Sequence, residues 1–421
     1  MRPPRNRRVF VVGYGAATPL GGTLARTWER AVRGEAGFRT ITRCAVDAAS
    51  KVVGEIPDWD PRAYRFASAK EVYNWNAAFV LLTMALCKDA LDDAGLAMDA
   101  GTAPRTACLV GSALNGTDAF RIASEQLRER GPLRVSPYLL PNLCANLPSG
   151  KAGILLGFTG PVFSPQGACA SGNHAIGLGA RMIRDGDCDF VLAGGVDMPI
   201  LPELVHGFEN MNATIRIGPK DRAWNDPSQA SRPFSRDRRG FVLAEGGAVL
   251  VLAAEDCLGS QGLTPRAEVL GVGWTSDAFH FTNPRQETIV RAIREAIEDG
   301  GISPADVQYV NAHGTSTPKG DAAEIACLRE VFGRHLKTMA VSSNKSQIGH
   351  TLGAAAAIEA VLTIEGMRRG VILPTINHIP DPALEDVDVV PNETRKQAVE
   401  IALSNAFGFG GTNCCILFRG A

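Results

Sequence analysis

The amino-acid sequence predicts an α/β fold that is built twice. Short apolar or β-branched runs alternate with segments of helical period along the 421 residues, which is typical of strands joined by crossover helices. Similar short motifs, each with a strand or loop followed by a turn and a helix, recur in the two halves of the chain. The length is enough for two or three average domains, or for one large duplicated body with a substantial core. We therefore expect parallel strands with helices between them.

The alternation locates the elements in chain order. The expected strands are Val9–Val12, Thr106–Val110, Phe190–Ala193, Ala248–Leu252, Val307–Val310, Thr338–Val341 and Cys414–Phe418. The expected helices include Trp75–Leu91, His174–Arg184, Gln286–Glu298, Ala322–Phe332 and Leu352–Met367.

A faint internal repeat indicates the domain organisation. The strand ending at Leu109–Ser112 leads through a glycine turn into a helix, much as Val310–Gly314 does. Cys169–Gly172 likewise opens a helix in the first half, as Gln347–His350 does in the second. The turn-rich stretch Gly259–Pro265 separates the copies. We expect one half at residues 1–260, carrying the cysteine word, and the other at residues 261–421, carrying the two histidine words.

Composition narrows the class of protein. The chain has 45% hydrophobic residues and 43 basic against 44 acidic side chains, so it has no whole-chain attraction to nucleic acid or to an anionic membrane. Its ten cysteines lack the spacing of a disulfide framework or a zinc site. No run of about 18 apolar residues is present, and the basic start precedes only a four-residue apolar run. We expect a cytoplasmic globular enzyme, with most cysteines buried and reduced.

Cys169 is the candidate nucleophile. It lies in Gly167-Ala168-Cys169-Ala170-Ser171-Gly172, where a loop turns through small residues into a helix. A helix N-terminus favours the thiolate, and small neighbours let a substrate carbonyl approach the backbone. The alternative is a buried structural cysteine, the default for this residue type.

Two histidines occupy comparable turns in the second half. His313 follows the strand that ends at Asn311, and His350 ends the word Ser343-Asn344-Lys345-Ser346-Gln347-Ile348-Gly349-His350. Carboxyl ends of strands are where α/β proteins place ligands. One such residue alone is equally well explained as a structural histidine. The second weakens that explanation and predicts a thiol beside two imidazoles.

Lys345 and Glu359 are expected to form an ion pair. Glu359 lies inside an alanine-rich helix that reads as buried, and a buried carboxylate requires a cation. For Lys345 alone, a solvated surface charge is the alternative.

Two further glycine-rich turns each raise a hypothesis about function. Phe409 has glycines on both sides in Phe407-Gly408-Phe409-Gly410-Gly411, which permits a movable aromatic gate. Gly13-Tyr14-Gly15 imitates a dinucleotide fingerprint, and an oxidoreductase is the hypothesis that it raises. The expected acidic residue at the end of a second strand is absent.

Together these words resemble the β-ketoacyl-acyl carrier protein synthases, the condensing enzymes of the thiolase superfamily. The resemblance covers essentially the whole chain, with the cysteine word, His313-Gly314-Thr315-Ser316-Thr317, the Lys345 to His350 word and the Phe409 turn in the family's order. It implies a thiolase-like duplicated fold of five layers, αβαβα. It also implies a decarboxylative Claisen condensation of a malonyl carrier with an acyl group on Cys169.

The resemblance also implies residue roles. Cys169 would be the acylated nucleophile, His313 and His350 the decarboxylation pair, and Lys345 with Glu359 the supporting ion pair. Phe409 would be the gate whose backbone N–H joins that of Cys169 in the oxyanion hole. Thr315 and Thr317 would hold the phosphopantetheine arm of an acyl carrier protein, with no metal or redox cofactor. Leu114 would be the apolar gate of the acyl pocket, as in the synthase II branch.

Alternatives within the family stay open. The chain is either an elongating fatty-acid synthase II or a type II polyketide ketosynthase paired with a chain-length-factor subunit, and family members are homodimers or heterodimers. A non-catalytic partner subunit would lack the nucleophilic cysteine. Departures from the housekeeping pattern are a less basic Ala67–Lys70, Tyr73-Asn74-Trp75-Asn76, and a long segment from Glu209 to Trp224. Arg216, Lys220 and Arg222 in that segment offer a basic surface for an acidic carrier, or an ordinary solvated charge run.

Overall fold

Ten strands form one mixed sheet in the computed structural model, which describes residues 7–60 and 77–421. The sheet order is β10-β9-β13-β14-β8-β1-β7-β6-β4-β5. The strands of the first half are β1 (Val9–Ala17), β4 (Thr106–Gly111), β5 (Val162–Phe163), β6 (Phe190–Asp197) and β7 (Gly246–Ala254). Those of the second half are β8 (Ala267–Ser276), β9 (Tyr309–Asn311), β10 (Ala340–Ser342), β13 (Ile401–Gly408) and β14 (Thr412–Gly420).

The two halves of the sheet have the same topology. If the five strands of each half are numbered in chain order, both halves read 3-2-4-5-1 across the sheet. The pairings also match, because strands 3, 2 and 4 run parallel and strands 4, 5 and 1 run antiparallel in each half. The halves meet through only two residue pairs between β1 and β8. This repeat confirms the predicted duplication.

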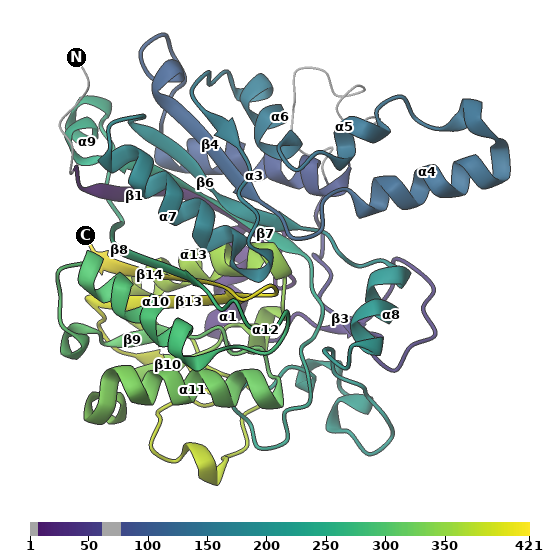
Figure 1. The fold of residues 1–421 in the computed structure, drawn as a ribbon, viewed down its shortest axis with the longest axis vertical. Coiled ribbons are helices and arrows are strands. Elements are labelled where there is room, and N and C mark those ends of the chain that lie inside the picture. The colour runs from purple at the N-terminus through teal and green to yellow at the C-terminus, as the bar shows by residue number, and fades with distance from the viewer. Residues whose placement is uncertain (1–6, 61–76) are drawn as a thin grey trace.

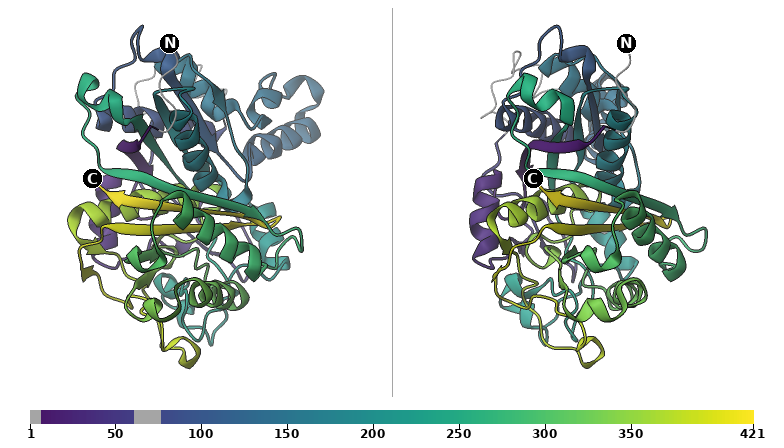
Figure 2. Two further views of the ribbon diagram at one scale, coloured as in Figure 1. Left: turned by 60° about the vertical axis from the view of Figure 1, so that its left-hand side comes forward. Right: turned by 90° about the vertical axis from the view of Figure 1, so that its left-hand side faces the viewer.

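Helices cover and separate the two half-sheets (Figures 1 and 2). The helices are α1 (Leu24–Val32), α3 (Ala78–Ala94), α4 (Thr117–Arg130), α5 (Leu139–Leu143), α6 (Leu147–Leu156), α7 (Ser171–Arg184), α8 (Pro202–Asn210), α9 (Glu255–Gln261), α10 (Gln286–Asp299), α11 (Pro318–Phe332), α12 (Lys345–Ile348) and α13 (Ala355–Arg369). Helix α3 lies on the outer face of the first half-sheet, and α10 lies on that of the second with α11 beyond it. Helices α7 and α13 contact both half-sheets and each other. The predicted αβαβα layering follows.

Small residues make the central layer possible. A Cβ on Gly172 of α7 would lie 2.6 Å from the backbone nitrogen of Ala357 on α13, so the two helices touch at their backbones. Asn173, next in α7, donates its side-chain amide to the carbonyl oxygens of Ser404 and Cys414, both at 3.2 Å. The alanine-rich start of α13 therefore lets the helix that follows the cysteine word reach the second half.

Every predicted strand and helix overlaps an observed one, but two expectations need correction. The sheet is mixed rather than parallel, because β7 and β14 run antiparallel to their neighbours. Strands β8 and β13 were not predicted. Two glycines interrupt the apolar pattern of β8, and they are required because a Cβ on Gly271 or Gly273 would come within 2.2 Å of an α10 carbonyl oxygen.

The expected domain boundary and three segments singled out in the sequence can be compared with the described residues. The expected boundary at residue 260 lies inside α9, just before β8, and the division into residues 1–260 and 261–421 stays a prediction. Ala67–Lys70, Tyr73–Asn76 and the start of the helix expected from Trp75 lie outside the described residues. Two further hairpin-like pairs, β2 (Arg39–Thr40) with β3 (Val52–Val53) and β11 (Val371–Ile372) with β12 (Arg395–Lys396), pack outside the main sheet.

Candidate active site

Cys169 lies on a single turn of 3₁₀ helix, Ala168–Ala170, that runs directly into α7. The preceding Ala168 has a φ of 48°, a left-handed conformation that is strained for a residue with a Cβ. The turn leaves Cys169 6% exposed. Its position at the start of α7 agrees with the sequence prediction.

His350 is the direct partner of the thiol. Its Nε2 lies 3.1 Å from the Cys169 sulfur. The residue is buried, and its backbone N–H donates to the carbonyl oxygen of Val242 at 2.8 Å. The ring of Phe241 packs against the imidazole edge-on, with centroids 5.1 Å apart. These contacts fix the ring so that Nε2 faces the sulfur.

His313 completes the pair of imidazoles. Its ring lies edge-on to that of His350, with centroids 5.5 Å apart, and edge-on to Phe407 of β13 at 5.5 Å. Its backbone N–H donates to Glu324 of α11 at 2.9 Å, as that of Gly314 does at 2.8 Å. The structure thus brings both predicted histidines to one site.

Two backbone N–H groups converge on the sulfur from different halves of the chain. The N–H of Phe409, in the hairpin between β13 and β14, lowers the pKa of the Cys169 thiol, and the N–H of Cys169 itself does the same. Thr412 donates its hydroxyl to the carbonyl oxygen of Gly167 at 2.8 Å and so fastens the hairpin to the cysteine turn. The Phe409 side chain is 38% exposed, and its role as a gate stays a prediction.

The thiol is not the resting thiolate that its position at a helix start predicted. Burial raises the pKa of Cys169 to about 12, although Lys345 and the two backbone N–H groups act in the opposite direction. Desolvation of the anion outweighs the stabilisation that these groups provide. The resting group is therefore a neutral thiol hydrogen-bonded to an imidazole.

Both imidazoles are neutral as well. Burial lowers the pKa of His313 and of His350 well below 6.5, and the positive charge of Lys345 lowers both further. Each ring therefore offers one N–H donor and one free nitrogen.

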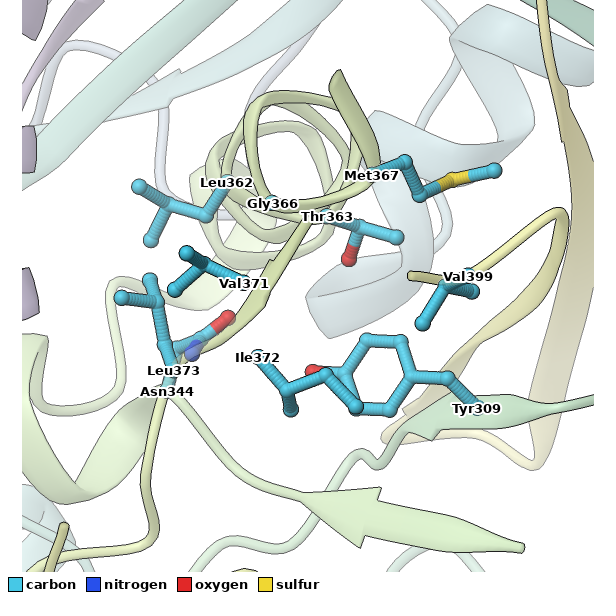
Figure 3. A pocket seen from close by; sticks show the side chains of 10 residues that line it. All are labelled: Tyr309, Asn344, Leu362, Thr363, Gly366, Met367, Val371, Ile372, Leu373 and Val399. Carbon is cyan, nitrogen blue, oxygen red and sulfur yellow. The ribbon is translucent and has the colours of Figure 1, made fainter. Parts of the chain in front are cut away.

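Lys345 and Glu359 form the predicted ion pair. Lys345 Nζ lies 2.5 Å from Glu359 Oε1, and both side chains are 1% exposed. Burial raises the pKa of Glu359 to about 7, against the effect of Lys345. Beside this pair lies a cavity of about 10 Å³, room for one water. It is lined by Tyr309, Asn344, Leu362, Thr363, Gly366, Met367, Val371, Ile372, Leu373 and Val399 (Figure 3), none of which belongs to the predicted site.

An apolar cluster extends from the thiol. Cys169 packs with Val205 of α8 and with Phe241, Leu243 and Leu352, and Leu114 and Phe208 border the same cluster. The predicted gate Leu114 therefore borders the apolar cluster that contains Cys169, and its role at an acyl chain stays a prediction.

Thr315 and Thr317 lie on the turn between His313 and α11. Their hydroxyl oxygens are 3.0 Å apart. Ser316 between them has a φ of 69°, and its hydroxyl accepts from the backbone N–H of Arg232 at 3.1 Å. Arg232 is itself buried and paired with Asp221 at 2.6 Å.

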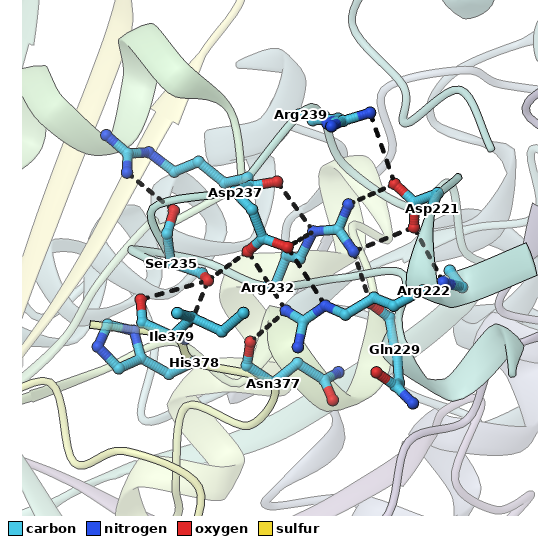
Figure 4. Close-up of polar contacts among 12 residues, drawn as sticks. Asp221, Arg222, Gln229, Arg232, Ser235, Asp237, Arg239, Asn377, His378 and Ile379 are labelled. Carbon is cyan, nitrogen blue, oxygen red and sulfur yellow. Dashed lines mark hydrogen bonds and ion pairs between the residues drawn. The ribbon is translucent and has the colours of Figure 1, made fainter. Parts of the chain in front are cut away.

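The network around Arg232 corrects one part of the sequence reading (Figure 4). Arg222 was offered as part of a basic surface for a carrier. It instead donates to the carbonyl oxygen of Asn377 at 2.6 Å and pairs with Asp237 at 3.3 Å, so its charge is used inside this network. Arg216 and Lys220 remain exposed.

Sequence reasoning missed two buried carboxylates that shape the site. Glu324 accepts from the His313 turn and from the side chain of Asn405 at 3.1 Å. Asp197, the last residue of β6, accepts from the turn that carries Leu114. Asp197 ends an apolar strand at its carboxyl edge, and Glu324 lies in the helix directly after the histidine word, which are the signals that point to them.

Two searches of the described part of the chain were negative. Between residues 7 and 60 and between 77 and 421, histidine, cysteine and acidic side chains do not gather in groups of three or more that could hold a metal ion. Nor does any helix in those ranges have both the length and the apolar character to cross a membrane.

Known proteins resemble this chain over its length. Residues 6–256 match the family described as "Beta-ketoacyl synthase, N-terminal domain", and residues 266–378 match "Beta-ketoacyl synthase, C-terminal domain". The 3-oxoacyl-[acyl-carrier-protein] synthase 2 of Staphylococcus aureus (strain COL) is 36% identical over 419 residues, which covers 99% of each chain.

Two solved structures share the fold. One is the ishigamide ketosynthase/chain length factor, with a TM-score of 0.89 and 29% identity, covering 99% of this chain and 100% of that one. The other is a type II polyketide acyl-carrier protein in complex with its ketosynthase bound to the hexaketide, with a TM-score of 0.88, 26% identity and the same coverage.

Proposed function

Because the chain belongs to the beta-ketoacyl synthase family, a family of condensing acyltransferases, we propose that Cys169, His313 and His350 carry its condensation reaction. The observation that carries the assignment is the 3.1 Å contact of His350 Nε2 with the Cys169 sulfur, with His313 edge-on behind it. Its substrates are acyl and malonyl groups borne on the phosphopantetheine arm of an acyl carrier protein.

The first half-reaction loads the acyl group. The Cys169 sulfur attacks the carbonyl carbon of the acyl thioester, and the thiol proton passes to His350 Nε2. The carbonyl oxygen becomes an oxyanion, and the N–H groups of Phe409 and Cys169 donate to it; their effect on the Cys169 thiol, whose pKa both lower, supports this role. The carbon–sulfur bond to the arm then breaks, and the arm's sulfur takes the proton from His350. One thioester replaces another, so the exchange costs little free energy.

The second half-reaction forms the carbon–carbon bond. The carboxylate of a malonyl thioester leaves as carbon dioxide, and the electrons of the broken bond move onto the thioester oxygen as an enolate. Once the sulfur is acylated, His350 Nε2 no longer accepts a thiol proton, so the neutral ring carries its own proton on that nitrogen. The N–H groups of His313 and His350 then stabilise the enolate, and this stabilisation is stronger in a buried site than in water. The enolate carbon attacks the acyl carbonyl carbon, and Cys169 leaves as a thiolate. The thiolate takes up one proton from solvent, and a β-ketoacyl carrier is released.

Other residues position the substrates. The hydroxyls of Thr315 and Thr317 hold the arm, and Leu114 borders the acyl chain in the cluster next to Cys169. Lys345 and Glu359 support the imidazoles, since the charge of Lys345 lowers the pKa of both. Phe409 is the gate.

The subunit pairs either with itself or with a chain-length-factor-like subunit. The second arrangement would make the enzyme a type II polyketide ketosynthase. The structural similarity to the ishigamide ketosynthase/chain length factor supports this arrangement. The 36% identity to a 3-oxoacyl-[acyl-carrier-protein] synthase 2 favours an elongating synthase, for which we propose the pairing of two identical subunits. Assaying condensation alone and with the candidate partner distinguishes the two.

Mass spectrometry tests the assignment of the nucleophile. After incubation with an acyl carrier protein, the wild-type chain gains the acyl mass on the peptide containing Cys169, and Cys169→Ala does not. Cys144→Ser is the matched control, because that thiol is exposed and lies outside the site. If no carrier delivers an acyl group to the wild type, the proposed function is wrong.

The same assay separates the two half-reactions. His313→Ala is expected to accept an acyl group on Cys169 while losing malonyl decarboxylation, because only the second half-reaction needs its N–H. Carbon dioxide release from labelled malonyl carrier measures that loss. If acylation and decarboxylation fall equally, this division of roles fails.

A further inference from the structure

Asp197 forms a hydrogen-bonded clamp at the end of β6. The residue is 0% exposed. Its carboxylate accepts from the hydroxyl of Ser112 at 2.6 Å and from the backbone N–H groups of Ala113 at 2.9 Å, Leu114 at 3.1 Å and Gly353 at 2.7 Å. One side chain therefore joins two turns, the Leu114 turn (residues 112–114) after β4 and the Gly353 turn (residues 350–354) before α13.

Both turns border the reacting sulfur. Leu114 and Leu352 belong to the apolar cluster that contains Cys169. The Gly353 turn begins at His350, and its Leu352 has a φ of 52°, a strained conformation that needs support from its surroundings. A Cβ on Gly353 would lie 2.7 Å from Asp197 Oδ2 and 2.6 Å from the Ala113 nitrogen. The two turns and the carboxylate are therefore packed without room to shift.

Among the described residues, the clamp is a buried carboxylate without a cation beside it, rather than a contact between apolar side chains. No ion pair to Asp197 occurs in residues 7–60 and 77–421, and burial raises its pKa to about 6. A buried carboxylate is normally neutralised by a cation. Here four donors from the two turns take that place, so its negative charge orients them.

We propose that Asp197 is a positioning residue that sets acyl-chain specificity, because it fixes the distance between Leu114 and the turn that begins at His350. The inference rests on the proposed function, in which the acyl chain leaves Cys169 past Leu114. A pocket wall that is held in place discriminates between chain lengths, whereas a wall that can move accepts chains that differ by several methylenes. Asp197 acts through Leu114 and touches no substrate.

Asp197→Asn tests the clamp. An amide nitrogen cannot accept a hydrogen bond, so one of the two turns loses its anchor. The ratio of kcat/KM for long against short acyl carriers is expected to shift toward long chains by about tenfold, the lower end of what one methylene is worth in a fitted pocket. Uptake of the shortest accepted acyl group by Cys169 stays close to the wild-type rate, because His350 keeps its other contacts.

Two further variants keep the test decisive. Glu268→Gln is the matched control, since this carboxylate is also buried but pairs with Arg8 away from the site; it is expected to lower thermal stability and leave the chain-length ratio unchanged. Ser112→Ala removes one donor of the four and is expected to shift the ratio in the same direction by less. It replaces Asp197→Asn as the test if that variant does not fold.

The outcomes separate the two proposals. An Asp197→Asn variant whose kcat/KM falls equally for every chain length, with the ratio unchanged, shows a merely structural residue and overturns the inference. So does an unchanged ratio in Ser112→Ala when the asparagine variant is unfolded. A wild-type chain that takes no acyl group on Cys169 overturns the proposed function instead.

Discussion

At the residue scale, the three reactive side chains are all held uncharged by burial. Desolvation raises the pKa of the Cys169 thiol and lowers the pKa of both imidazoles. Transfer of the thiol proton to the neutral imidazole of His350 creates a thiolate beside an imidazolium, and burial disfavours both charges until a substrate takes up the electron pair of the sulfur. Activation of the nucleophile is therefore tied to the arrival of a substrate carbonyl.

The neutral thiol is directly measurable. The measurement is the difference in thiolate absorbance between the wild type and Cys169→Ser as the pH rises. We expect no step in this difference around the ordinary cysteine pKa of 9.0, because burial raises the pKa of Cys169 in the folded chain to about 12. Ionisation then begins only as the pH approaches the higher value. A step at or below 9.0 would show instead that the helix start governs this thiol.

Lys345 adds to the effect of burial in keeping both imidazoles neutral. Lys345→Met removes the positive charge that lowers both pKa values, so the pKa of His350 and of His313 should rise toward 6.5. An imidazole with a higher pKa becomes protonated sooner as the pH falls, and protonated His350 cannot accept the thiol proton. The acid limb of Cys169 acylation should therefore move to higher pH.

Rates of acyl uptake against pH, with histidine ring titration by NMR, measure this effect. Lys337→Met is the control, because that lysine is exposed and away from the site. An acid limb at the same pH in Lys345→Met and in the wild type would contradict the role given to this charge.

At the element scale, the hairpin of β13 and β14 carries one of the two proposed oxyanion donors, the backbone N–H of Phe409. Gly408 lets it dock, since a Cβ there would lie 2.3 Å from the Gly167 carbonyl oxygen and 3.2 Å from the Cys169 nitrogen. Gly408→Ala should lift the hairpin from the cysteine turn and withdraw the Phe409 N–H. We expect Cys169 acylation to slow by about 100-fold, the usual effect of losing one oxyanion donor.

Stopped-flow acylation measures that loss, and circular dichroism checks that the fold is kept. Gly259→Ala on α9 is the matched control, because a Cβ there meets nothing within 4 Å. Equal rates in Gly408→Ala and the wild type would exclude the hairpin from the reaction.

The elements also explain what could be foreseen from the sequence. Cys169, His313 and His350 were found because each lies in a glycine-rich turn next to a helix or strand, which is a local pattern. The protonation of the thiol was not, because burial depends on β13, α7 and α13 meeting around it. Asp197 and Glu324 were not predicted as site residues, because their hydrogen-bond partners lie on turns that are distant in the sequence. Strand β8 was not predicted because its glycines, which make room for α10, interrupt the apolar pattern of the strand.

At the scale of the whole molecule, one face is unusually apolar for an exposed surface. Helix α4 projects from the body (Figure 1), and large apolar side chains are exposed on it and nearby, including Leu127 on α4, Leu140 on α5, Ile154 on α6 and Leu133, which is 96% exposed. Edge strand β5 lies beside them and pairs with β4 alone among the described strands. Surfaces of this kind mark protein–protein contacts.

A subunit of the same fold is expected to cover this face. Sedimentation should give the mass of two subunits, either for the chain alone or after addition of its chain-length-factor-like partner. The double variant Leu140→Arg with Ile154→Arg should remain a monomer, because two unpaired charges would be buried in the contact. Arg128→Glu is the control, since this exposed side chain on α4 is already charged. A wild-type chain that sediments as a monomer under both conditions would contradict the expectation.

The division of the site between the halves has a consequence during protein synthesis. Cys169 is 181 residues ahead of His350, and the Phe409 hairpin follows later still. A ribosome-bound chain therefore displays Cys169 long before His350, its proposed proton acceptor, and Phe409, one of its two proposed oxyanion donors, have been made. Until the hairpin has been translated and docked, the proposed site is incomplete. We therefore expect that nascent and prematurely terminated chains do not take acyl groups from the carrier protein.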